Sequence, residues 1–252
     1  KTFDKGADAV IIDLEDSVPI DQKVETRTNL LSYIETKDFD KTILIRVNPL
    51  DTKFGEDDIS LLSDVSSKID AFILPKIEEA DLLNDLPNNL VVLVETPKAV
   101  KNLGQLACHE NVIGIALGGA DLSATLGADM SWDSLLFTRS AIIIEAAING
   151  LFTIDSPFMN IEDISSLKKE AGLSSSLGFD GKAAIHPDQI DYITKSFLPD
   201  AKDIEEAKEI LKAFNSSKEA VIAHKVKMID MPIVLSMEKR LKLVGIDPKN
   251  ID

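Results

Sequence analysis

The chain has 252 residues, of which 44% are apolar, so it can bury a large core and is not intrinsically disordered. Its 43 acidic and 27 basic side chains give a formal net charge of −16, which disfavours nucleic acid as a partner because phosphate binding needs a basic surface. No apolar stretch reaches the roughly 18 residues of a membrane span, and the single cysteine excludes an internal disulfide framework. We therefore expect a cytoplasmic protein with no membrane partner.

Short apolar runs alternate with longer amphipathic segments along most of the chain. The runs are rich in Val, Ile and Leu and do not alternate with polar residues, which is typical of strands buried on both faces of a parallel sheet. We predict seven strands, at residues 10–14, 43–47, 71–74, 91–94, 113–117, 151–154 and 182–185. Helices are predicted at residues 134–149, closed by Gly150, and at 202–215, with Asp200 as N-cap.

This alternation favours an α/β fold, specifically a (β/α)8 TIM barrel, which needs eight strands in about 250 residues. We expect the barrel's first strand to be lacking in this chain and to precede Lys1. After about residue 217 the pattern changes, and helices at 219–227 and 233–244 are predicted on either side of a turn at 228–232. The predicted organisation is a catalytic barrel domain over residues 1–216 and a C-terminal helical extension over residues 217–252.

Polar and charged side chains follow each predicted strand within one or two residues. In a barrel these strand ends meet at one rim, where active sites form. The residues concerned are Glu15, Asp16, Arg46, Lys76, Glu95, Asp121, Asp155 and His186. So many carboxylates at close range repel one another, and a divalent cation would remove that penalty.

Glu95 and Asp121 are the predicted metal pair, because they end successive strands and can be neighbours at the rim. Two carboxylates, with waters and substrate oxygens, are the usual ligands of Mg²⁺ in proteins. Gly118 and Gly119 allow close approach of the backbone to a ligand, and free N–H groups there could hold a carboxylate. The alternative is that each acid caps the helix that follows it, with Asp121 as an N-cap.

Arg46 follows a buried strand, and its guanidinium can hold a substrate carboxylate through two hydrogen bonds. The alternative for Arg46 is a salt bridge to an acid of the rim such as Glu15 or Asp16. Lys76 is a weaker candidate that is expected to pair with Glu95 or Asp16. His186 could act as a base, although a structural role is the favoured interpretation.

Eight segments occur in order within residues 7–244, nearly the whole chain. They are ADAVIIDLEDSV, ILIRVNP, FILPKIE, VETPKAV, IALGGADLSATLGA, RSAIIIEAAINGLFTIDSPF, GFDGKAAIHPDQI and KMIDMPIV. Together they resemble the citrate lyase beta-subunit-like family of the HpcH/HpaI aldolase group, within the phosphoenolpyruvate/pyruvate superfamily. Eight blocks in order are far more specific than one short motif.

The resemblance implies a (β/α)8 barrel in which Glu95 and Asp121 hold Mg²⁺, with Mn²⁺ also suited to oxygen ligands. It implies that Arg46 grips the carboxylate of an oxaloacetate-like or glyoxylate-like 2-oxo acid. Backbone N–H groups around Gly119 and Ala120 would assist Arg46 in binding that carboxylate.

Further roles concern the two ends of the chain. The Asp of the KMID segment, here Asp230, is implied to act in acid/base chemistry at the rim of a neighbouring subunit in a homotrimer or hexamer. Glu15 and Asp16 are expected beside the substrate, where they would orient metal-bound waters.

The expected reaction is cleavage of a citryl-type or malyl-type 3-hydroxyacyl thioester, carried by coenzyme A or an acyl-carrier protein. The products would be a 2-oxo acid such as oxaloacetate and an acetyl-type thioester. Two alternatives stay open. One is a thioester-independent class II hydroxy-acid aldolase, and the other is a non-catalytic subunit that docks a carrier protein among other lyase subunits.

Overall fold

The computed structural model describes residues 6–87, 89–217, 219–225 and 227–251. The chain divides into two compact units, Lys1–Ile190 and Asp191–Asp252. No helix in the described ranges combines the length and the apolar character that crossing a lipid bilayer requires.

A seven-stranded, all-parallel sheet forms the centre of the first unit, and its strands follow one another in chain order. All seven predicted strands are confirmed: β3 has the predicted ends, and the ends of the other strands differ from the prediction by at most three residues. The strands are β1 (Ala9–Asp13), β2 (Thr42–Arg46), β3 (Ala71–Leu74), β4 (Leu90–Val94), β5 (Val112–Leu117), β6 (Phe152–Asp155) and β7 (Gly181–Lys182).

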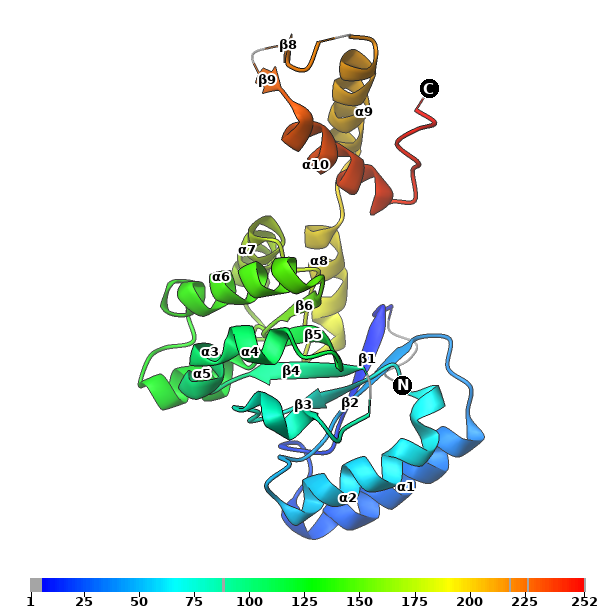
Figure 1. The fold of residues 1–252 in the computed structure, drawn as a ribbon, viewed down its shortest axis with the longest axis vertical. Helices are drawn as coiled ribbons and strands as arrows, with labels where there is room; N and C mark the ends of the chain where they lie inside the picture. The colour runs from blue at the N-terminus through cyan, green and yellow to red at the C-terminus, as the bar shows by residue number, and fades with distance from the viewer. Residues whose placement is uncertain (1–5, 88, 218, 226, 252) are drawn as a thin grey trace. The chain divides into compact units, whose positions relative to one another are not determined.

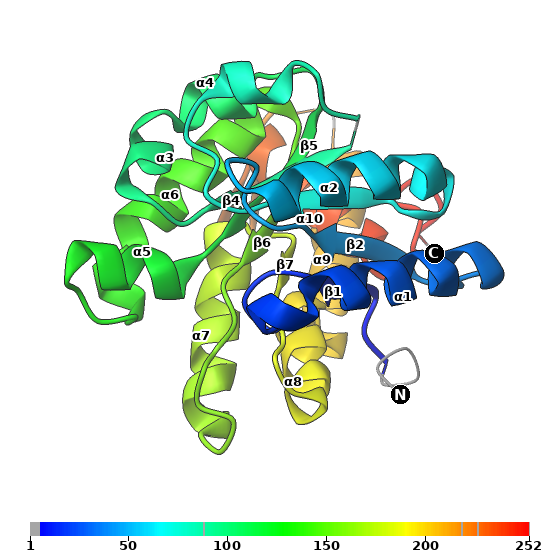
Figure 2. The ribbon, with the colours of Figure 1, turned by 90° about the horizontal axis from the view of Figure 1, so that it is seen from below.

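Helices and short 3₁₀ turns occupy the connections between consecutive strands, as parallel pairing requires. They lie outside the curled sheet, and Figure 2 shows α1, α2, α4 and α6 around the strands. The helical elements in these connections are η1 (Ile20–Gln22), α1 (Lys23–Thr36), α2 (Lys53–Leu62), η2 (Ser63–Lys68), η3 (Ala80–Leu83), α3 (Pro97–Lys101), α4 (Leu103–Ala107), α5 (Gly119–Leu126), α6 (Trp132–Asn149) and α7 (Ile164–Leu177). A further helix, α8 (Pro187–Phe197), follows β7. The predicted helix at 134–149 is confirmed: it begins two residues earlier, and Gly150 closes it in the left-handed conformation.

The sheet is curled into a half-barrel (Figure 1). Ala71 and Ile73 of β3, with Val91 and Leu93 of β4, belong to one buried apolar cluster, as side chains two apart on one face of a strand should. Within the described residues β1 and β7 each pair on one side only. A closed (β/α)8 barrel with a further strand before Lys1 stays a prediction.

The second unit contains α9 (Ala201–Asn215), β8 (Ile222–His224), β9 (Lys227–Ile229) and α10 (Met231–Lys242). The predicted helix at 202–215 is confirmed, and Asp200 caps it in a capping box. The predicted helix at 233–244 is also confirmed, although it begins at Met231 and ends two residues early. Apolar residues of α9, β9 and α10 form a core of their own within this unit.

The helix predicted at residues 219–227 is wrong. Its described part instead contains β8, which pairs antiparallel with β9, and residue 226 lies outside the described ranges. Lys225 has a φ of 55°, a left-handed conformation that a helix interior cannot accommodate but a tight connection between strands can. The residues after 216 are therefore not wholly helical. The domain boundary at residue 216 stays a prediction, and the compact units meet instead at Ile190 and Asp191.

A buried ionic contact ties the first two helices to the loop after β2. Arg27 of α1 donates from Nε to Asp58 of α2, and both side chains are almost fully excluded from solvent. The second oxygen of Asp58 accepts hydrogen bonds from the backbone N–H and the side-chain amide of Asn48, at 2.8 and 2.7 Å. Because Asn48 follows Arg46 by two residues, this contact also fixes the chain beside the rim of the sheet.

Replacement of Asp58 by alanine should therefore lower the free energy of unfolding by about 3–5 kcal/mol, because Arg27 and the Asn48 N–H would be left buried without partners. Asp57→Ala is the matched control, since Asp57 is partly exposed and its closest ion pair is with the surface residue Lys53. Urea unfolding of both variants measures the difference. Similar losses in the two variants would contradict the assignment of Asp58 as the buried anchor.

Candidate active site at the carboxyl ends of the strands

Asp13 and Arg46 lie opposite each other at the ends of β1 and β2. The guanidinium donates from Nε and Nη2 to the two oxygens of Asp13, both at 2.7 Å. Burial alone would raise the pKa of Asp13, but these hydrogen bonds and one from the Glu15 backbone outweigh it and lower the pKa to about 2. The salt-bridge alternative for Arg46 is thus present in the structure. Its main partner is Asp13, which the pattern of apolar runs predicts inside a strand rather than at the rim.

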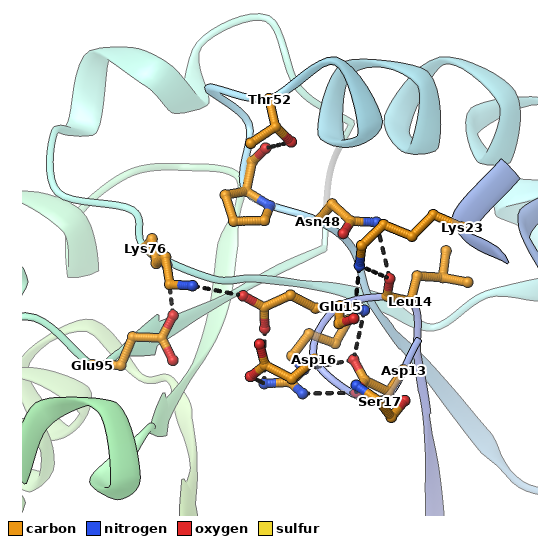
Figure 3. A network of polar contacts seen from close by, with 12 residues as sticks. Asp13, Leu14, Glu15, Asp16, Ser17, Lys23, Asn48, Thr52, Lys76 and Glu95 are labelled. Atoms are coloured by element: carbon orange, nitrogen blue, oxygen red, sulfur yellow. Dashed lines mark hydrogen bonds and ion pairs between the residues drawn. The ribbon is translucent and has the colours of Figure 1, made fainter. Parts of the chain in front are cut away.

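Glu15 lies between the side chains of Lys76 and Arg46, and Figure 3 shows its contact with Lys76. Its Oε1 is 3.1 Å from Lys76 Nζ, and its Oε2 is 2.9 Å from Arg46 Nη1, although Oε2 accepts no well-aligned hydrogen bond. The side chain is only 4% exposed, and burial raises its pKa despite the nearby positive charges. Asp16 is much more exposed and lies 3.4 Å from the same Nη1, a weaker contact.

Lys76 connects Glu15 to Glu95. Its backbone N–H donates to Glu95 Oε1 at 2.8 Å, while its ammonium binds Glu15 (Figure 3). The expected side-chain pairing of Lys76 with Glu95 or Asp16 is therefore wrong, because Glu95 contacts the main chain of Lys76 and Glu15 takes the ammonium.

Glu95 follows β4, is 2% exposed and packs against Gly118 of the neighbouring strand end. A Cβ at Gly118 would come within 2.4 Å of Glu95 Cβ and 2.7 Å of Oε2, so only glycine leaves room for this carboxylate. Burial raises the pKa of Glu95 to about 8, and the charges of Glu15 and Asp121 add to the effect. The negative charge of Asp121 therefore acts on the carboxyl group of Glu95, and a metal site shared by the two residues stays a prediction.

Asp121 is the third residue of α5, and Gly118 occupies the cap position. The N-cap alternative for Asp121 is therefore wrong, because the helix begins two residues before it. The carboxylate is half-buried, and within the part of the chain described here it forms no hydrogen bond or ion pair. Gly119 and Ala120 form the first turn of the same helix, where backbone N–H groups are not used by the helix itself.

Negative charge exceeds positive charge in this cluster. Arg46 is bound by Asp13, and Lys76 by Glu15, which leaves Glu95 and Asp121 with no ion-pair partner among the described residues. A divalent cation fits this arrangement, because two carboxylates with waters suffice for Mg²⁺ and a cation would remove the repulsion between them. No group of three or more His, Cys, Asp or Glu side chains in the described ranges is arranged to hold a metal, so protein ligands beyond this pair are not expected.

The ends of β6 and β7 are neutralised by a buried ionic network that the sequence analysis missed. Asp155 accepts from Arg139 Nε and from Lys182 Nζ, both at 2.8 Å, and Lys182 also binds Glu170. The signal in the sequence was a single arginine within the apolar helix pattern of α6. Since Asp155 has two cationic partners, it is not available as a ligand.

The remaining predicted residues lie elsewhere. His186 is partly exposed, and its Nδ1 accepts from the Asp188 backbone at 3.3 Å, in keeping with a structural role. Asp230 belongs to the second unit, where it is the N-cap of α10 and accepts from the Ile233 backbone N–H.

The family model described as HpcH/HpaI aldolase/citrate lyase matches residues 1–187. The chain belongs to this family.

Curated relatives agree with the HpcH/HpaI assignment. Citrate lyase subunit beta of Leuconostoc mesenteroides subsp. cremoris is 30% identical over 263 residues, which cover 95% of this chain and 86% of that protein. L-malyl-CoA/beta-methylmalyl-CoA lyase of Cereibacter sphaeroides is 28% identical and covers 92% of this chain and 86% of that protein. The chain is thus a carbon–carbon lyase of the HpcH/HpaI family.

A solved structure of Mycobacterium tuberculosis CitE, in complex with magnesium, acetoacetate and coenzyme A, has the same fold. It superposes with a TM-score of 0.82 at 28% identity, covering 94% of this chain and 90% of that one.

The raised pKa of Glu95 predicts that the folding stability of the metal-free protein depends on pH. Between the ordinary value of 4.5 and about 8, folding keeps a proton on Glu95 that the unfolded chain releases, so stability falls as the pH rises through this window. Glu95→Gln should therefore raise the free energy of unfolding by about 2–4 kcal/mol at pH 8.5 and change it little at pH 4.

Urea unfolding in EDTA over this pH range measures the effect. Glu110→Gln is the control, because it removes the same charge from an exposed position. Equal behaviour of the two variants at pH 8.5 would show that Glu95 is not buried as a charged group.

Proposed function

We propose that this chain is a Mg²⁺-dependent lyase that cleaves a citryl-type or malyl-type 3-hydroxyacyl thioester of coenzyme A or an acyl-carrier protein. The products would be a 2-oxo acid such as oxaloacetate and an acetyl-type thioester. The observation that carries the proposal is the pair of Glu95 and Asp121, which have no cationic partner among the described residues and lie on the rim that also holds Arg46. The names of the relatives supply the substrate class.

Glu95 and Asp121 would hold the cation. The burial of Glu95 against Gly118 and its hydrogen bond from Lys76 fix one ligand before any metal binds. The M. tuberculosis neighbour was crystallised with magnesium, and carboxylate oxygens also suit Mn²⁺. When bound, the cation would supply Lewis-acid stabilisation to the oxygens of the 2-oxo acid portion of the substrate.

Arg46 would bind the substrate carboxylate through Nη1. Asp13 holds Nε and Nη2, so the guanidinium is fixed in one orientation. The exposed Asp16 makes only a 3.4 Å contact with Nη1, and an anionic ligand could replace it there. The N–H groups of Gly119 and Ala120 at the start of α5 would bind the same ligand, since a helix N-terminus favours an anion.

The reaction would be a retro-Claisen cleavage. A base takes the proton of the substrate hydroxyl, and the electron pair of the broken O–H bond forms the carbonyl of the 2-oxo acid. The electron pair of the scissile C–C bond moves into the thioester as an enolate. An acid then protonates that enolate at carbon. Asp230 is the proposed acid or base, contributed by a neighbouring subunit of a homotrimer or hexamer, while Glu15 and Asp16 would orient waters.

The curled sheet would belong to a (β/α)8 barrel. This proposal is supported by seven parallel strands in chain order and by the open edges of β1 and β7 within the described residues. Closure would bring the ends of β1 and β7 to the same rim as the carboxylate pair.

The two alternatives differ from this proposal in the substrate that is turned over. Citryl-CoA and malyl-CoA, free citrate and malate, and the carrier-bound thioester can be compared with and without Mg²⁺. Turnover of the free acids alone would favour the thioester-independent aldolase. Carrier binding without turnover of any substrate would favour the docking subunit.

The proposal predicts that Glu95→Gln and Asp121→Asn each weaken Mg²⁺ binding and lower thioester cleavage by about 100-fold or more, because each removes a charged ligand. Calorimetric titration with MgCl₂ and a coupled oxaloacetate assay measure the two quantities. Asp38→Asn, on a fully exposed side chain, is the control and should change neither. Wild-type values of affinity and turnover in both test variants would rule out the proposed metal site.

A further inference from the structure

Lys76 contacts two buried carboxylates of the site, one through its main chain and one through its side chain. Its N–H is 2.8 Å from Glu95 Oε1, and its Nζ is 3.1 Å from Glu15 Oε1. Both acids are almost fully buried, so the two contacts replace hydration that the carboxylates have lost. The three residues come from the ends of β1, β3 and β4, and Lys76 lies between the two acids (Figure 3).

The main chain of Lys76 is in an unusual conformation. Its φ is 54°, in the left-handed region that a side chain with a Cβ disfavours and glycine adopts freely. A lysine held there marks a position where the surroundings determine the backbone, and such positions cluster at functional sites. Here the left-handed turn after β3 directs the N–H at Glu95.

We infer that Lys76 is a positioning residue of this site, an inference that rests on the proposed function. Its left-handed main chain holds Glu95 in place for the cation, and its ammonium holds Glu15 and supplies positive charge beside the carboxylate pair. The two contributions act oppositely on the cation. A fixed Glu95 strengthens cation binding, whereas the ammonium repels the cation and attracts the anionic oxo acid.

Opposite signs make the two contributions separable. Lys76→Met removes the ammonium and keeps an unbranched side chain, so Mg²⁺ should bind about three- to tenfold more tightly and oxaloacetate should bind more weakly by a similar factor. Lys76→Val is also neutral, but a β-branched residue resists the left-handed conformation, which should move the N–H away from Glu95. Mg²⁺ should then bind about tenfold more weakly than in Lys76→Met.

Two further variants serve as controls. Lys76→Gly keeps the N–H and accepts the backbone conformation without strain, so its Mg²⁺ affinity should match that of Lys76→Met. Lys53→Met removes one positive charge from an exposed position on α2 and should leave both affinities unchanged. The affinities are measured on the full chain by calorimetric titration with MgCl₂ and, at saturating Mg²⁺, with oxaloacetate. Weaker Mg²⁺ binding by Lys76→Met would overturn the role of the ammonium, and equal affinities of the Val and Met variants would overturn the role of the main chain.

A measurement without metal separates this inference from the proposed function. In EDTA, Lys76→Met and Glu15→Gln, alone and together, form a double-mutant cycle in urea unfolding. The inference predicts that the two effects are not additive, and additive effects would overturn it. If the wild-type chain binds no Mg²⁺ while the coupling persists, the hold of the Lys76 ammonium on Glu15 stands and the proposed metal-dependent function fails.

Discussion

Burial of carboxylates at the carboxyl ends of parallel strands is the constraint on which this structure depends. A parallel sheet brings its strand ends to one edge, and here that edge gathers acids from β1, β4 and the start of α5. An ionised carboxylate removed from water must be paired, coordinated or protonated. Asp13 is paired with Arg46 and has a pKa of about 2, whereas Glu95, with only a backbone N–H, has a pKa of about 8. The same edge therefore holds one acid that is stable as an anion and another that is not.

The cationic side chains at the rim pair with carboxylates other than Glu95. Asp155 pairs with two buried cations, one from α6 and one from β7. Asp13 pairs with Arg46, and Glu15 pairs with the ammonium of Lys76. Glu95 and Asp121 are left without a cationic side chain among the described residues. Because Gly118 has no Cβ, the side chain of Glu95 fits beside it. The backbone N–H of Lys76, in its left-handed conformation, donates one hydrogen bond to Glu95. The lyase chemistry of the family is consistent with a site in which one divalent cation would compensate the remaining negative charge.

The strands of the sheet and most residues of the rim could be predicted from the sequence. Apolar runs without alternation indicate buried parallel strands, and the residues that follow each run lie at the rim. Glu95 and Asp121 were selected as the candidate metal pair in this way. Asp13 was not predicted at the rim, because an acid inside an apparent strand gives no local sign that it faces Arg46; that contact depends on the register of β1 against β2. The segment of β8 is predicted as part of a helix and most of β9 as part of a turn, because a short apolar run flanked by lysines fits both the helical and the strand period. The left-handed conformation of Lys225 decides in favour of the hairpin. The main-chain hydrogen bond of Lys76 could not be predicted either, because no sequence pattern indicates a left-handed conformation for a lysine.

Proton release on cation binding tests the central claim most directly. With a pKa of about 8, Glu95 is mostly protonated at pH 7, so a cation that binds its carboxylate must displace that proton. Titration of MgCl₂ into the metal-free protein in buffers of different ionisation enthalpy counts the protons released. The account predicts close to one proton per bound Mg²⁺ at pH 7 and almost none at pH 9.5. Binding of Mg²⁺ at pH 7 with no proton release would contradict it.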